Sequence, residues 1–269
     1  MRWKQVGMLP TPSTSHVSYD YIYEPAEDSY LLLDTLSSAA EATFLRERFA
    51  SNTSKNVPLV LEVGTGSGVV LAFLAANASA IFGRADVLTL GVDINSLACR
   101  ASAETVRLAV KEHRTSSNNA AQFLDAVNGD LTTCLKNGSV DVLVFNPPYV
   151  PAPLPDLAKH AVYNTSAADL TSQQRFERDS HLLELSYAGG DDGMEVTDRL
   201  LDQIPQVLSP QRGVAYVLLC AQNKPQVVKA RISQWPGGWT AETVGVSGKQ
   251  AGWEKLCIVR ICRSAGSTG

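Results

Sequence analysis

The chain contains the stretch Pro58-Leu-Val-Leu-Glu62-Val-Gly64-Thr-Gly-Ser-Gly68, in which a short apolar run ends in a glycine-rich turn. Short apolar runs bounded by turn residues are typical of strands that are buried on both faces of a parallel sheet. The apolar residues that follow predict a buried helix. Glycines in the turn let the backbone bend sharply and let a ligand approach the main chain. The stretch therefore predicts an α/β unit with a ligand site at its turn.

The same order of strand and helix repeats along the rest of the chain. Apolar runs predict strands, and a period of about 3.6 residues predicts the helices between them. We expect strands at 58–63, 87–92, 122–127, 140–145 and 213–219, one or two helices within 26–49, further helices at 95–111 and 194–207, and a closing antiparallel pair at 240–246 and 255–261. Strands that alternate with helices form βαβ units. We therefore predict a doubly wound, Rossmann-like α/β fold with a mostly parallel seven-stranded sheet.

Two segments fall outside this alternation, a polar insertion at 113–121 and a long loop at 151–181. Loops of such length are often lids or recognition segments, and a tolerated surface insertion is the alternative. The 269 residues fit one large α/β domain. The predicted division is an N-terminal arm at 1–22, one domain at 23–263 with a helical extension at 23–56 and a lid or recognition loop at 151–182, and a tail at 264–269.

The charge balance argues against binding that depends on many nucleic-acid phosphates. Lysine and arginine number 23 and aspartate and glutamate 27, for a net charge of −4. Proteins that take their affinity from the phosphate backbone carry an excess of positive charge. We therefore expect no direct contact with nucleic acid.

The five cysteines are an odd number and form no Cys-x-x-Cys pair, which disfavours a disulfide scaffold and a structural zinc site. The N-terminal residues lack the apolar core of a signal peptide. The longest uncharged window, 63–83, begins with the glycine turn, so we interpret it as a turn and a buried helix and not as a membrane span. We expect no metal site, no membrane contact and a cytoplasmic location, with the nucleus as an alternative.

The glycine motif differs from the dinucleotide-binding fingerprint, in which the third glycine follows the second by three residues. Val69 occupies that position here. The spacing Gly64-x-Gly66-x-Gly68, with Glu62 two residues upstream, looks like the first motif of class I methyltransferases. A carboxylate at this place suits S-adenosylmethionine, which carries a cationic amino group and no pyrophosphate. The motif therefore favours that cofactor over a nicotinamide, and a structural turn without a ligand is the alternative.

Two more acidic residues follow predicted strands. Asp93 ends the second strand and is placed to accept hydrogen bonds from both hydroxyls of a ribose, although a helix N-cap with Asn95 is an alternative role. Asp130 follows the third strand and is placed to accept from the exocyclic amine of an adenine, with the backbone of Leu131 facing the ring. Together with Glu62, these residues predict a nucleoside site at the carboxyl ends of the strands.

The turn Asn146-Pro147-Pro148-Tyr149 follows the fourth strand and so faces the same edge of the sheet. Its prolines make the turn stiff and remove N–H groups. The Asn146 side-chain oxygen and the Pro147 carbonyl are placed to hold both hydrogens of a planar NH₂ group, with Tyr149 as an apolar wall. Such a clamp promotes methyl transfer mainly by positioning a poorly nucleophilic nitrogen. A proline turn without this role is the alternative.

Together with the glycine motif, this turn resembles that of amino-methyltransferases acting on planar nitrogens of glutamine, adenine, cytosine or guanine. The segment Tyr23-Glu-Pro-Ala-Glu-Asp-Ser29 looks like the N-terminal signature of the eukaryotic HemK-like release-factor glutamine methyltransferases, and the segments 188–193, 207–213 and 249–252 agree. The resemblance covers about residues 20–262 and implies a class I methyltransferase fold with S-adenosylmethionine as cofactor. By position it implies these cofactor-binding residues: Ser29, Glu62, Gly64, Gly66, Asp93, Asp130, Leu131 and Asn146.

The resemblance also implies a reaction and two partners. The reaction is methyl transfer to the side-chain amide nitrogen of the glutamine in the Gly-Gly-Gln motif of the eukaryotic class I release factor. The substrate contacts are expected at Asn146, Pro147, Pro148 and Tyr149. A small zinc-binding activating subunit is the implied heterodimer partner, and we expect it at the edge strand 122–127. The chain departs from the family pattern by longer segments at 113–121 and 159–182, which bear on the surface that faces the substrate.

Three other functions stay open at this point. The family is also linked to methylation of protein lysines, and related enzymes methylate adenine or cytosine in nucleic acid. A non-catalytic nucleotide-binding subunit is the third alternative. Such a subunit has no need to keep Glu62, Asp93, Asp130 and Asn146 together, whereas this chain has all four.

Overall fold

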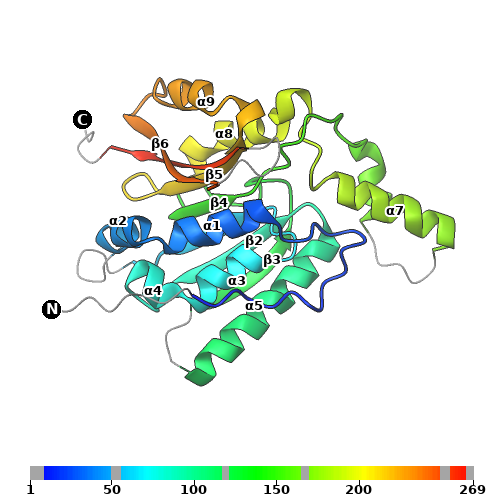
Figure 1. Cartoon of the computed structure of the whole chain (residues 1–269), viewed down its shortest axis with the longest axis horizontal. Coiled ribbons are helices and arrows are strands. Elements are labelled where there is room, and N and C mark those ends of the chain that lie inside the picture. The colour runs from blue at the N-terminus through cyan, green and yellow to red at the C-terminus, as the bar shows by residue number, and fades with distance from the viewer. Residues whose placement is uncertain (1–8, 50–55, 117–120, 165–169, 249–254, 265–269) are drawn as a thin grey trace.

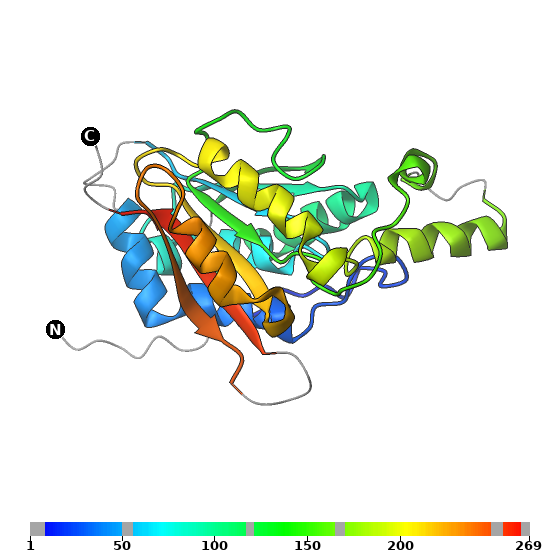
Figure 2. The same ribbon diagram turned by 90° about the horizontal axis from the view of Figure 1, so that it is seen from above.

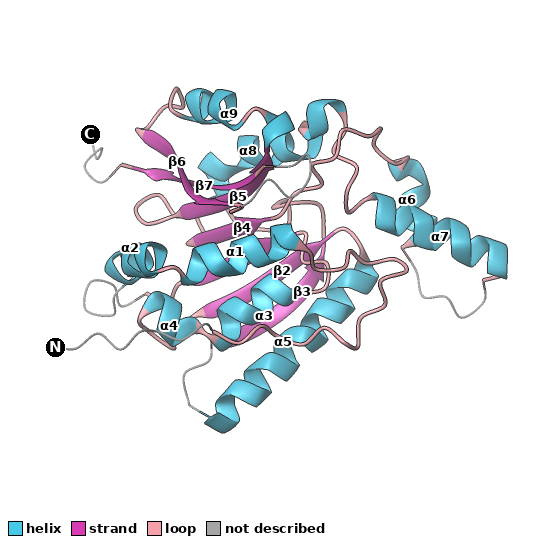
Figure 3. Ribbon diagram, in the orientation of Figure 1, coloured by secondary structure: helices cyan, strands magenta, loops and turns pink. Residues whose placement is uncertain are grey.

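The computed structural model describes residues 9–49, 56–116, 121–164, 170–248 and 255–264. Within these ranges, seven strands form one sheet in the order β3-β2-β1-β4-β5-β7-β6 (Figure 3). The strands are β1 (Leu59–Val63), β2 (Leu88–Asp93), β3 (Gln122–Asn128), β4 (Val142–Phe145), β5 (Val214–Cys220), β6 (Trp239–Val246) and β7 (Leu256–Arg263). Strands β1 to β5 pair in parallel, and β7 pairs antiparallel with β5 and β6. The predicted fold class is confirmed.

Helices cover both faces of this sheet (Figure 1, Figure 2). One face packs against α1 (Glu27–Ser37), α2 (Ala39–Phe49), α3 (Val69–Ala76), α4 (Ala78–Phe82) and α5 (Ser96–Ser116), and the other against α8 (Glu195–Val207) and α9 (Pro225–Ile232). Alternate strand residues serve the two cores: in β1, Val60 belongs to the first, and Leu61 and Val63 belong to the second. All residues of α3 are buried, which explains its uniformly apolar sequence. No helix in the described part of the chain is long and apolar enough to span a bilayer.

The prediction that residues 151–182 form a loop is wrong for the second half of this segment. It contains the short helices η1 (Leu157–Lys159) and α6 (His160–Tyr163), and from residue 172 it forms α7 (Ser172–Glu184). Helix α7 starts at a capping box, in which the Thr171 hydroxyl accepts from the Gln174 backbone N–H and the Gln174 side chain accepts from the Thr171 N–H. This Thr-x-x-Gln signal was available in the sequence.

The predicted insertion at 113–121 is partly helical, because α5 continues to Ser116. Residues 117–120 lie outside the described residues, as does the segment 249–252 that supported the family resemblance. Three further short or irregular elements complete the described chain: the η2 turn (Asp191–Gly193), the η3 turn (Ala221–Asn223) and an extended stretch at 9–26.

The extended stretch runs beside α5 (Figure 1). Val17 and Ile22 are buried against Ala98 of that helix, and the Asn95 side chain donates to the Tyr21 carbonyl. Residues 1–8 and 265–269 lie outside the described residues, so the predicted bounds of arm, domain and tail stay predictions.

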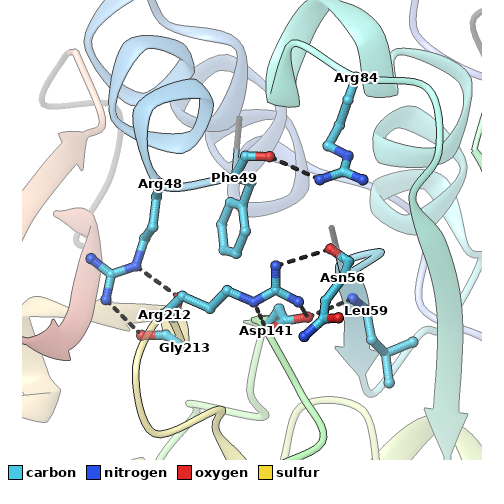
Figure 4. Close-up of polar contacts among 8 residues, drawn as sticks. All are labelled: Arg48, Phe49, Asn56, Leu59, Arg84, Asp141, Arg212 and Gly213. Carbon is cyan, nitrogen blue, oxygen red and sulfur yellow. Dashed lines mark hydrogen bonds and ion pairs between the residues drawn. The ribbon is translucent and has the colours of Figure 1, made fainter. Parts of the chain in front are cut away.

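A charged cluster holds the amino ends of the strands together, at the edge of the sheet away from the cavity described below (Figure 4). The Asp141 carboxylate, which precedes β4, accepts from the Arg212 guanidinium at 2.8 and 2.9 Å and from the Leu59 N–H at 3.0 Å. Arg48 of α2 donates to the Arg212 carbonyl at 2.7 Å. The Arg212 guanidinium lies over the Phe49 ring. The cluster thus joins α2 to the starts of β1, β4 and β5.

Candidate active site

The carboxyl ends of β1 to β4 border a cavity of about 240 Å³. Loops after neighbouring parallel strands converge at this edge, where ligands of open α/β sheets bind. The lining includes every residue predicted for the site: Ser29, Glu62, Gly64, Gly66, Asp93, Asp130, Leu131, Asn146, Pro147, Pro148 and Tyr149. It also includes Asp28, Arg199, Leu157 and Leu182, which the sequence reasoning did not assign. The fold therefore brings the predicted residues together, and their roles stay predictions.

The glycine turn between β1 and α3 supplies one wall of the cavity. Gly64 and Gly66 adopt left-handed backbone angles, with φ of +66° and +50°. A Cβ atom at Gly66 would meet no atom within 4 Å, so glycine is needed there for the turn and not for packing. The Gly66 N–H donates to Oδ2 of Asp93 at 2.9 Å, which fixes the turn against the end of β2.

Glu62 is buried at the end of β1, and its Oε2 accepts from the Leu71 N–H at 2.9 Å. That N–H belongs to the first turn of α3, where backbone donors lack partners within the helix. Burial raises the pKa of Glu62 well above its ordinary value, the bond from Leu71 lowers it, and the nearby charge of Asp93 raises it further. A cationic group in the cavity would favour the charged form of this carboxyl.

The sequence left open whether Asp93 binds a ribose or caps the following helix together with Asn95. Besides the Gly66 bond, the Asp93 carboxylate accepts from the Asn95 N–H at 2.8 Å. The Asn95 side chain caps α5, and its oxygen accepts from the Leu97 N–H at 2.9 Å. The alternative role is therefore confirmed for Asn95, whereas Asp93 contacts only the N–H of this cap residue. Burial raises the pKa of Asp93 against the opposing effect of its hydrogen bonds, which include one from the Thr65 side chain.

Asp130 and Leu131 form the turn after β3. The Asp130 carboxylate, 43% exposed, pairs with Arg199 of α8. Leu131 is buried and has a φ of +52°, a strained conformation for a residue with a side chain. The following residue, Thr132, is held by Gln203 of α8, whose side-chain oxygen accepts from its N–H at 3.0 Å. Helix α8 therefore holds the strained turn at the mouth of the cavity.

Asn146 faces a carboxylate that the sequence reasoning did not select. Its Nδ2 donates to Oδ2 of Asp28 at 3.1 Å, and the Tyr149 hydroxyl donates to the same oxygen at 3.5 Å. The other oxygen of Asp28 accepts from the N–H and hydroxyl of Ser29, at 2.5 and 3.2 Å. The Asn146 Oδ1 is buried without a hydrogen-bond partner. The sequence signal for Asp28 was its place beside Ser29 in the N-terminal signature.

The backbone of this turn is held from outside by the loop at 188–193. Val150 and Ala188 form an isolated parallel bridge. A Cβ atom at Gly193, whose φ is +67°, would lie 2.0 Å from the Tyr149 carbonyl oxygen. Asn223 donates to the Gly193 carbonyl at 3.3 Å and contacts the Tyr149 carbonyl at 3.5 Å. The glycine is thus required for the close approach of this loop.

No family model matches the chain, but individual proteins do. The chain is 34% identical over 264 residues to the Methyltransferase HEMK2 of Mus musculus, which covers 95% of this chain and 98% of the relative. It is 34% identical over 259 residues to the eRF1 methyltransferase catalytic subunit mtq2 of Schizosaccharomyces pombe, with 95% and 96% covered. The chain belongs to the HEMK2 methyltransferase family. It is also 28% identical over 190 residues to the Release factor glutamine methyltransferase of Nitratidesulfovibrio vulgaris, with 70% and 54% covered.

Membership in the HEMK2 family confirms the resemblance seen in the sequence and makes the protein an S-adenosylmethionine-dependent methyltransferase. The cavity suits this cofactor chemically, because buried carboxylates can meet a cationic amino group and ribose hydroxyls beside an open glycine turn. Among the described residues, no group of three or more His, Cys, Asp or Glu side chains is placed to hold a metal ion.

Proposed function

We propose that this HEMK2 family member methylates the side-chain amide nitrogen of the glutamine in the Gly-Gly-Gln motif of the eukaryotic class I release factor. The observation that carries the proposal is the buried, unpartnered Oδ1 of Asn146 in the cavity. A buried acceptor without a partner costs free energy, and an N–H donor from a substrate removes that cost. The names of two relatives, which refer to eRF1 and to release-factor glutamine, support this substrate.

The cofactor would lie along the carboxyl ends of β1 to β3. Glu62 would face its amino group and Asp93 its ribose hydroxyls, while Asp130 and the Leu131 backbone would meet the adenine. Bound S-adenosylmethionine supplies an electrophilic methyl group on a sulfonium. The Ser29 segment, which begins α1, would close over it.

The residues after β4 would hold the acceptor amide. The Asn146 Oδ1 accepts one N–H and the Pro147 carbonyl accepts the other, so that the nitrogen lone pair is aimed at the methyl group. Methyl transfer to this nitrogen would leave it with one proton in excess, which would pass to water. Tyr149, the last residue of this turn, lines the cavity and would form one wall beside the amide. Such positioning of a weak nucleophile is a large part of the rate enhancement.

Mass spectrometry of a purified release factor tests the substrate. Incubation with the full chain, labelled S-adenosylmethionine and the activating subunit should add one methyl group to the glutamine of Gly-Gly-Gln. The matched control is a release factor in which that glutamine is asparagine, which keeps the amide but withdraws it by one methylene. A release factor with alanine in place of that glutamine serves as a second control. Methylation of either variant at the full rate, or methylation of a lysine, would contradict the glutamine assignment.

We further propose that a small zinc-binding subunit covers the free edge of β3. Among the described strands, β3 pairs with β2 alone, and its residues are partly or fully exposed, with Leu124 at 46%. An edge of this kind offers unpaired N–H and C=O groups to a partner strand. The S. pombe relative is named a catalytic subunit, which fits a protein that works with another chain. The complex would act in the cytoplasm, where translation terminates.

Hydrogen exchange with and without the subunit locates this contact. Protection should rise across 122–128, whereas β6, at the opposite edge of the sheet, serves as the internal control and should not change. Unchanged exchange over β3 would contradict the placement.

A further inference from the structure

The first turn of α1 carries a buried carboxylate that the reaction scheme above does not use. Asp28 is 2% exposed and lies 118 residues from Asn146 in the chain, yet the two side chains are hydrogen bonded. One oxygen, Oδ1, accepts from the Ser29 N–H at the start of α1, and the other, Oδ2, accepts from Asn146 and Tyr149. The carboxylate therefore joins the N-terminal signature to both ends of the turn after β4.

The chemistry of this contact determines which way the Asn146 amide faces. The two ends of an asparagine amide have nearly the same shape, so packing distinguishes them weakly and hydrogen bonds decide. An ionised carboxylate only accepts, which requires the NH₂ end of Asn146 to face Asp28. The oxygen end must then face away from Asp28, and it is this atom that is buried without a partner.

We propose that Asp28 is a positioning residue that presents the Asn146 oxygen, and not its nitrogen, to the acceptor NH₂ group. The proposal rests on the proposed function of Asn146. A negative charge on the NH₂ end of the amide also polarises it and makes the oxygen a better acceptor. The bond from Tyr149 holds the wall of the acceptor site to the same carboxylate.

The variant Asp28→Asn tests this idea because it keeps the shape of the side chain. An asparagine that still accepts from Ser29 through its oxygen turns its NH₂ group toward Asn146. The Asn146 amide is then expected to reverse and to point its own NH₂ group at the substrate. We expect kcat for release-factor methylation to fall about 10–100-fold, the range found for residues that orient a functional group. The affinity for S-adenosylmethionine should change less than about 3-fold.

Glu27→Gln is the matched control, because it removes an equal charge from the neighbouring, exposed position of the same helix. Its kcat should equal that of the unmodified chain. A double-mutant cycle separates positioning from a general structural role. In the Asn146→Ala background, Asp28→Asn should cause a much smaller loss of kcat, since no amide remains to be oriented and only the long Tyr149 contact changes. A loss of equal size in both backgrounds would overturn the proposal.

A measurement without substrate makes the test independent of the proposed function. In the ¹⁵N-labelled full chain, the side-chain amide signal of Asn146 should shift in Asp28→Asn and stay in place in Glu27→Gln. An unmoved Asn146 signal would refute the orienting role of Asp28, whatever the substrate. Full activity of Asn146→Ala would instead refute the clamp itself, and the two failures are therefore distinguishable.

Discussion

The carboxylate of Glu62 at the end of β1 accepts a hydrogen bond from the backbone N–H of Leu71 in the first turn of α3, across 2.9 Å. The bond spans the glycine turn, so one buried side chain both lines the cavity and fixes the helix that follows it. A residue of this kind links the shape of the turn to the charge in the site. Its protonation state should therefore affect ligand binding.

Binding of S-adenosylmethionine should weaken as the pH is lowered, and it should do so at a higher pH than titration of an exposed glutamate would cause. Burial raises the pKa of Glu62 well above its ordinary value, so this carboxyl takes up a proton at a higher pH than an exposed glutamate does. The protonated form does not attract the amino group of the cofactor, so affinity is lost as the pH falls through the raised pKa. Calorimetry at a series of pH values measures the effect.

Glu62→Gln is the control for that prediction, because glutamine still accepts from Leu71 but does not titrate. Its affinity should be lower at pH 7 and nearly independent of pH. If the pH dependence of Glu62→Gln equals that of the parent chain, another group causes it. Asp93 is then the next residue to test, because burial raises its pKa too.

Asp93→Ala should weaken S-adenosylmethionine binding by about 10–150-fold, which corresponds to the loss of one hydrogen bond to a charged group. The expected cause is the loss of acceptors for the ribose and of the bond from Gly66 that shapes the turn. Asp125→Ala removes an exposed carboxylate from neighbouring β3 and should bind normally. Equal calorimetric affinities for the Asp93 variant and the parent chain would remove Asp93 from the site.

Asn146→Ala should lower the rate of methyl transfer about 10²–10³-fold, as expected for one lost preorganised hydrogen-bonding group. Much of the cofactor affinity should remain, because the acidic residues of β1 and β2 are untouched. Single-turnover transfer of labelled methyl and calorimetry separate the two effects. A parallel loss of binding and rate would place Asn146 with the cofactor alone.

Gly193→Ala should destabilise the protein by at least about 1–3 kcal/mol and impair methyl transfer. The added Cβ would meet the Tyr149 carbonyl oxygen at 2.0 Å, and the left-handed backbone disfavours alanine. Denaturant unfolding measures the loss. Gly248→Ala is the control, because a Cβ there meets no atom within 4 Å. Similar stability of both variants would show that the loop at 188–193 can move away from the turn.

Local sequence patterns were sufficient to predict the strands and most residues of the site. The ends of the seven strands differ from the predicted ones by at most two residues, because apolar runs and turn residues act over a few positions. The same holds for the glycine turn and for Asp93, Asp130 and Asn146, each of which lies at the end of a strand or within two residues after it. The helix α7 was missed because its exposed, polar sequence lacks an apolar stripe, and only its capping box marks the start.

Contacts between distant segments needed the folded chain. Asp28 is one acid among several in a polar N-terminal segment, and no local period distinguishes it from Glu27 or Glu24. Its role emerges only when the first turn of α1 lies against the turn after β4, with the Asp28 carboxylate 3.1 Å from Asn146. The composition and periodicity of the sequence are enough to predict the α/β layers, since the pattern of apolar residues that marks each strand and helix lies within a short stretch of sequence. Which polar atoms meet in the cavity was decided by tertiary packing, because a hydrogen bond needs its two atoms placed to within a few tenths of an ångström, and no sequence spacing specifies that.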